Sequence, residues 1–109
     1  MSGGHFDYDQ YRLGYISDSI KEVILNNNIQ PEYWYGEWNG QVYNDKTIDE
    51  FKKAIAFLDI ALCYAQRVDW LLSGDDGEDN FITRLEDELN KLKQSDEYGY
   101  VGKILESKI

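Results

Sequence analysis

The sequence predicts an all-α fold: a small helical bundle of three to four helices in a single domain that spans residues 1–109. Three observations lead to this class. Apolar residues recur at helical spacing in several stretches, helix start and stop signals separate these stretches, and 109 residues suffice for one core. Hydrophobic residues make up 42% of the chain, so its high charge does not predict disorder.

The first helix is expected from about Asp9 to Asn28. Its apolar stripe consists of Leu13, Ile16, Ile20, Val23 and Ile24. The polar run at 26–28, followed by Pro31, predicts its end, and Asp7 or Asp9 is the expected N-cap.

An aromatic segment, PEYWYGEWNGQVYND, follows this helix. Its Asn39-Gly40 pair favours a two-residue turn, so a short β-hairpin is a further expectation here. The aromatic side chains either close one end of the core or stack on a base or a protein partner, and closing the core is the preferred interpretation.

The second helix is expected to begin at a capping box from Thr47 to Glu50 and to continue to Ser73, with Gly74 allowing a left-handed exit. The stretch AIAFLDIALCYA is apolar almost all round. Such a helix is either central in the fold or shared with another subunit, which makes a homo-oligomer a reasonable inference.

A third helix is expected from about Glu78 to Gln94, and a last short helix after Gly99. The predicted buried stripe of the third helix is formed by Phe81, Ile82, Leu85, Leu89 and Leu92. Its opposite face is charged and is expected to be solvated.

A formal net charge of −10 argues against direct nucleic-acid binding and against attraction to anionic membranes, because both require clustered Lys and Arg. Two interpretations of the acidity are left open: solubility, which is favoured, and imitation of a polyanion. One cysteine permits no intramolecular disulfide, and neither a signal peptide nor a membrane span is apparent. We therefore expect a cytoplasmic protein.

Catalytic and metal chemistry receive little support. Cys63 lies in the most apolar helix, far in sequence from the single histidine, His5, so a Cys–His pair is not favoured. The segment SGDDGED fails as a calcium loop, because the positions of its ligands do not match that motif. A magnesium site built from Asp75, Asp76 and His5 stays open, although an interhelical turn in which Asp76 or a neighbour caps the next helix is the favoured interpretation. No cofactor is expected.

The opening segment SGGHFDY is explained least well by helix packing. It is either a mobile terminus or a segment that docks against the bundle near SGDDGED. Its aromatic residues are costly to leave in water, and two glycines permit close approach to a ligand or another chain.

Two stretches, SGGHFDYDQYRLGYISDSI and YNDKTIDEFKKAIAFLDIALCYAQRVDWLLSGDDGEDNF, resemble a family of small phage, prophage and bacterial proteins. The resemblance covers the chain from Ser2 to about Leu89, with SGGHFDY and WLLSGDDGE as its most specific parts and the aromatic segment as its least matched. It implies no catalytic role for any residue. It implies a context, since small accessory genes of this kind act on host functions that include bacterial defence systems.

The sequence thus favours a non-enzymatic accessory protein that binds and inhibits a host component, either a host protein or a small nucleotide signal. The alternatives are a metal-assisted phosphohydrolase and a virion structural or assembly protein. The candidate binding residues are aromatic, cationic or acidic and lie in the opening segment, the first two helices, the aromatic segment and SGDDGED: His5, Phe6, Tyr8, Tyr11, Arg12, Trp34, Tyr35, Trp38, Arg67, Trp70, Asp75 and Asp76.

Overall fold

The computed structural model describes residues 5–27 and 43–107. Four helices make up these two ranges: α1 (Tyr11–Leu25), α2 (Asp45–Leu72), α3 (Glu78–Ser95) and α4 (Tyr100–Ser107). The described ranges contain no strand, and the predicted all-α bundle is confirmed. The expected hairpin lies outside the described residues, together with Trp34, Tyr35 and Trp38.

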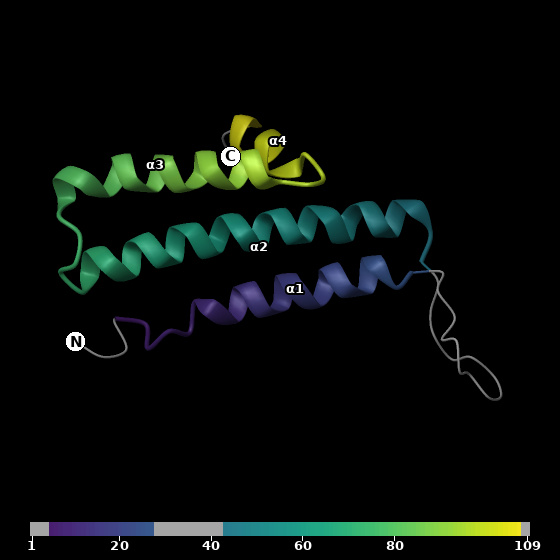
Figure 1. The fold of residues 1–109 in the computed structure, drawn as a ribbon, viewed down its shortest axis with the longest axis horizontal. Helices are drawn as coiled ribbons and strands as arrows, with labels where there is room; N and C mark the ends of the chain where they lie inside the picture. Colours follow the sequence, from purple (N-terminus) through teal and green to yellow (C-terminus); the bar gives the residue numbers. More distant parts are fainter. Residues whose placement is uncertain (1–4, 28–42, 108–109) are drawn as a thin grey trace.

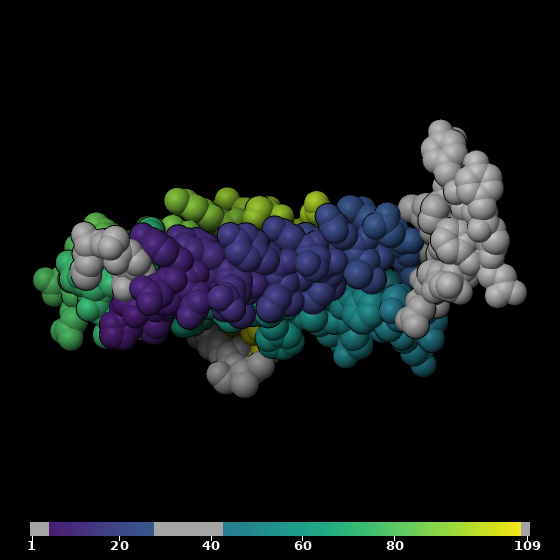
Figure 2. All heavy atoms as spheres, turned by 90° about the horizontal axis from the view of Figure 1, so that it is seen from below, coloured from purple at the N-terminus to yellow at the C-terminus, as the bar shows by residue number. Residues whose placement is uncertain are grey.

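Helix α2 is the centre of the arrangement. Helices α1 and α3 run antiparallel to it on opposite sides, and α4 packs against both α2 and α3 (Figure 1). Among the described residues, α1 contacts no helix other than α2. Seen from the α1 side, the outer surface of α1 lies open along its length (Figure 2).

Helix α2 begins earlier than its sequence signal indicates. The side chain of Asn44 is the N-cap and accepts a hydrogen bond from the backbone N–H of Thr47 at 2.9 Å. The predicted capping box is therefore wrong, because Thr47 already lies in the first turn. The predicted end is confirmed, since the helix stops at Leu72 and Gly74 adopts φ +84°.

Although α2 has 28 residues, no helix in the described part of the chain combines the length and the apolar character that a membrane span requires.

The start of α1 also differs from the prediction. Neither Asp7 nor Asp9 caps the helix; Gln10 occupies the N-cap position and makes no side-chain cap. A tight turn takes over this role, with Asp7 and Tyr8 at φ 53° and 64° and the N–H of Asp9 donating to the carbonyl of Phe6 at 3.0 Å. The chain thereby folds back across the end of the bundle before α1 begins.

The apolar core is small. Six hydrophobic residues of the described ranges are buried, and all belong to α2, α3 or α4: Ile48, Ile55, Ala56, Leu85, Leu89 and Val101. Ile16, Val23 and Ile82 were predicted to face the core but are 50%, 42% and 63% exposed. Helix α1 has a single neighbouring helix and therefore buries only a narrow stripe of its surface. Ile16 and Val23 lie outside that stripe.

The buried stripe of α1 is partly polar. The Ser17 hydroxyl donates to Asp59 Oδ1 at 2.7 Å, and Gln10 Nε2 donates to Gln66 Oε1 at 2.8 Å. Between these contacts, a Cβ on Gly14 would lie 3.3 Å from Leu62 Cδ2, so the two helices approach closely there. Directional contacts at both ends of this stripe fix the register of α1 on α2.

The cap assignment leads to a test. Replacing Asn44 with Ala removes the acceptor of the Thr47 N–H and should lower the free energy of unfolding by about 1 kcal/mol, measured by urea denaturation. Thr47→Ala keeps the backbone N–H and should change stability less. A larger loss of unfolding free energy for Thr47→Ala than for Asn44→Ala would contradict this assignment and support the predicted capping box.

Candidate functional site

The described part of the opening segment, from His5 onward, lies against the C-terminal end of α2. The backbone N–H groups of His5 and Phe6 both donate to Asp69 Oδ1, at 2.7 Å and 2.9 Å. Asp69 is 3% exposed, so its carboxylate is buried beneath this segment. The described part of SGGHFDY therefore docks against the bundle, on the same helix end from which SGDDGED emerges.

The side chain of Asp76 is almost fully buried, at 1% exposed. Arg67 Nη2 lies 3.1 Å from its Oδ2, and Arg84 Nη1 contacts its Oδ1. Of the two predicted alternatives, Asp76 itself does not cap α3; its neighbour Gly77 occupies the N-cap position, without a side-chain cap. A buried carboxylate requires opposite charge around it, and two guanidinium groups from different helices meet that requirement here.

The backbone of the turn directs Asp76 inward. Gly74 adopts a left-handed conformation, and the N–H groups of Asp75 and Asp76 both point to the carbonyl of Trp70, at 2.8 Å and 3.1 Å. The chain thus wraps over the last turn of α2. Asp75 stays exposed, whereas Asp76 returns to the interface between α2 and α3.

Arg67 is packed as well as paired. Its guanidinium carbon lies 4.0 Å from the centroid of the Trp70 ring, and its side chain is 6% exposed. A cation on a tryptophan face is a favourable contact when desolvated. Within the described ranges neither the Nε of Arg67 nor the Oδ2 of Asp76 has a hydrogen-bond partner, so the two side chains interact as an ion pair, with Nη2 3.1 Å from Oδ2.

This geometry bears on the magnesium hypothesis. Both oxygens of Asp76 face arginines, and the His5 ring stacks edge-on against Phe6 with centroids 5.1 Å apart. The described ranges hold no group of three His, Cys, Asp or Glu side chains placed to bind a metal ion. The Asp76 carboxylate stabilises the contact between α2 and α3.

Cys63 is the nucleophile considered from the sequence. Its side chain is half-buried in α2, and this burial raises the pKa of the thiol above its ordinary value, with smaller contributions from Glu88 and Asp59. A raised pKa lowers the thiolate fraction near neutral pH, as expected for a packing residue.

The remaining described candidates lie at the start of α1. The rings of Tyr8 and Tyr11 stack with centroids 6.1 Å apart, and Arg12 pairs with Asp9 at 3.5 Å on the surface. Tyr15 follows four residues after Tyr11 and is 69% exposed. We call Tyr8, Tyr11 and Tyr15 the tyrosine stripe; Tyr8 precedes α1, Tyr11 and Tyr15 belong to it, and all three are exposed.

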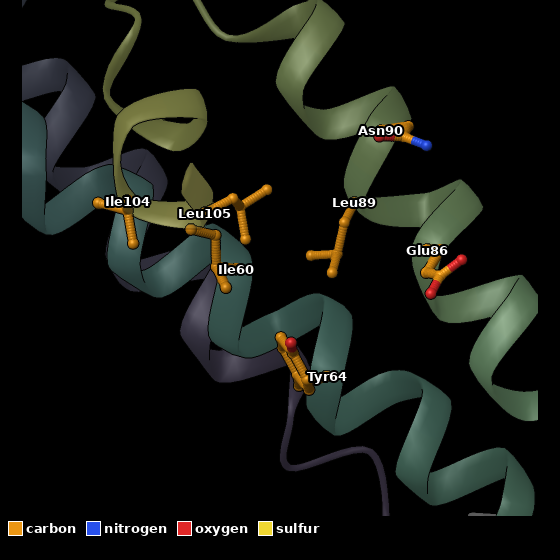
Figure 3. Close-up of a pocket in the computed structure, with 7 residues that line it drawn as sticks. All are labelled: Ile60, Tyr64, Glu86, Leu89, Asn90, Ile104 and Leu105. Carbon is orange, nitrogen blue, oxygen red and sulfur yellow. The ribbon is translucent and has the colours of Figure 1, made fainter. Parts of the chain in front are cut away.

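A hollow of about 660 Å³ opens between α2, α3 and α4. The close-up in Figure 3 shows side chains from all three helices around it: Ile60, Tyr64, Glu86, Leu89, Asn90, Ile104 and Leu105. Aliphatic side chains form its floor, while Glu86 and Asn90 stand on α3 at its edge. Three helices create this hollow jointly, which explains why no single sequence segment predicts it.

Asp69 and Arg84 were missed by the sequence analysis. Asp69 carried a usable signal, since a carboxylate in the apolar second helix needs a partner if it is buried. Arg84 carried no such signal, because it lies among the charged residues of α3.

A comparison of the chain with protein-family models, with curated proteins and with solved structures finds no match.

The buried pair leads to a second test. Asp76→Ala leaves Arg67 buried without its counter-charge and should lower the free energy of unfolding by about 3–5 kcal/mol in urea denaturation. The matched control is Asp75→Ala, one residue away and exposed, which should change stability little. Equal effects of the two substitutions would contradict the structural role assigned to Asp76.

Proposed function

We propose that this chain is a non-enzymatic accessory protein of the phage type that binds a host protein and inhibits it. The observation that carries the proposal is the tyrosine stripe on the open surface of α1. Tyr8, Tyr11 and Tyr15 are 55%, 40% and 69% exposed, so none of the three rings is packed into the core. Exposed tyrosines that share one face are typical of a binding surface.

Acidic side chains extend this surface. Asp18 and Glu22 are exposed and continue the outer surface of α1, three and seven residues after Tyr15. With a net charge of −10 on the whole chain, this arrangement favours a partner whose surface is basic. A host protein that binds nucleic acid has such a surface, and complementary charge would speed its capture.

The geometry favours protein binding over sequestration of a nucleotide. A nucleotide phosphate needs accessible cations, but the Arg67 guanidinium is buried against Asp76 and Trp70. Arg12 is exposed but lies beside Asp9. The resemblance to small phage and bacterial proteins supports the accessory role and a host defence component as the target.

The test combines identification with measurement. The protein should be purified from infected or defence-expressing cells and everything that copurifies with it identified by mass spectrometry. We expect a stoichiometric host protein with a basic surface, whose affinity is then measured with both proteins purified. Replacing Tyr11 and Tyr15 with Ala should weaken that affinity at least about 30-fold, as for hot-spot residues.

Ile82→Ala is the control, because it removes a 63% exposed apolar side chain from α3, outside the stripe. It should leave the affinity unchanged. Release of a nucleotide without any protein partner would overturn the proposal, as would a partner that binds the double tyrosine variant as tightly as the original chain.

A further inference from the structure

Helix α2 carries a row of residues that repeats at alternating intervals of three and four, the spacing of a coiled coil. Small and large members alternate along the first four positions of this row. We call it the α2 row: Ala54, Phe57, Ala61, Tyr64, Val68 and Leu71.

The α2 row is largely open in the single chain. Phe57 is 50% exposed, Tyr64 is 45% exposed, and Ala61 between them is exposed. Helix α1 uses a different side of α2, through Asp59 and Gln66. Helix α4 borders one edge of the row, where Phe57 and Tyr64 line hollows together with Ile104. The rest of this apolar face has no complete cover from the described part of the chain.

We propose that this face binds a second copy of the same chain, with the two α2 helices packed antiparallel. Ala54, Ala61 and Val68 occupy the first position of successive seven-residue repeats, and each is followed three residues later by the fourth position. In an antiparallel pair, a first position of one copy lies opposite a fourth position of the other. The resulting pairs are Ala54 with Leu71, Ala61 with Tyr64, and Val68 with Phe57, in each case the smaller residue opposite the larger one. All three pairs are produced by one two-fold axis that passes between positions 61 and 64.

A parallel arrangement lacks this fit. It would place Ala61 on Ala61 and Tyr64 on Tyr64, which leaves voids at one level and crowding at the next. The antiparallel register therefore identifies the occupant as a second copy, because this row complements its own sequence read in reverse.

Charge supports the same register. The α2 row contains no charged residue, so no like charges face each other between Ala54 and Leu71, and Glu50, one turn before Ala54, is paired with Lys53 at 2.8 Å. Lys53 and Lys103 both lie near the Tyr100 ring, at 5.9 Å and 5.2 Å, and line a hollow together with Phe57. The proposed register brings the C-terminal end of the second copy's α2, which has negative dipole character, opposite Lys53.

A neighbouring side chain extends the face. Leu72, one residue beyond the row, is 54% exposed at the C-terminal end of α2. Together with the half-exposed rings of Phe57 and Tyr64 it enlarges the apolar surface that a second copy would cover, and a specific interface buries at least about 1,200 Å² in total.

This inference goes beyond the proposed function. The tyrosine stripe lies on the outer surface of α1, away from the α2 row. A dimer would therefore present two stripes at once, and a partner with repeated sites would be bound with avidity.

The first experiment is sedimentation velocity of the purified chain over a range of micromolar concentrations. We expect a species of twice the 12.8 kDa chain mass. Ala61→Glu places an acidic group beside the two-fold axis and should convert this species to monomer without loss of helical signal. The matched control Ile82→Glu, at a 63% exposed position of α3, should leave the dimer intact.

The second experiment measures direction. In a Cys63→Ser background, spin labels at Leu72→Cys or at Lys46→Cys report the distance between the two copies. The antiparallel register predicts axial separations of roughly 30 Å and 50 Å respectively, from a rise of 1.5 Å per residue. Equal short distances at both positions would overturn the register. A chain that stays monomeric at all concentrations, or a dimer that survives Ala61→Glu, would overturn the proposal.

Discussion

The ion pair between Asp76 and Arg67 is the interaction on which the rest of the structure depends. It joins the turn after α2 to α2 itself, and Arg84 extends the contact to α3. Because α4 packs against both α2 and α3, the position of α3 on α2 also determines where α4 can lie. At the other end of α3, Asp96 accepts a hydrogen bond from the N–H of Val101 at 2.8 Å and so positions α4.

Polar contacts also determine where α1 lies, since the buried hydrophobic residues of the described ranges all belong to the other three helices. Ser17 pairs with Asp59, and Asp69 holds the chain just before α1 begins. Apolar burial is non-directional, whereas these contacts permit one register. With α1 held on one side of α2, its tyrosine stripe points to solvent and the α2 row stays accessible, so the two proposed interaction surfaces follow from the same polar contacts.

The sequence was informative about elements and less so about contacts. Helical periodicity and the glycine after Ser73 predicted the helices and the exit from α2, because those signals are local. The caps at Asn44 and Gln10 were missed, since several polar residues stood near each helix start and the sequence did not distinguish among them. The role of Asp76 could not be predicted, because it depends on Arg84 eight residues further on and on how far α3 folds back. The docking of His5 depends in the same way on Asp69, a partner distant in sequence.

The central claim is that Asp76 acts through Arg67 to hold the acidic turn in place. A double-mutant cycle of Arg67→Ala and Asp76→Ala, measured by urea unfolding, tests this claim most directly, because it isolates the energy of the pair from other effects of each substitution. The account predicts a coupling free energy of about 2 kcal/mol for this pair and almost none for the matched cycle of Arg67 with Asp75. Additive effects of Arg67→Ala and Asp76→Ala would contradict it.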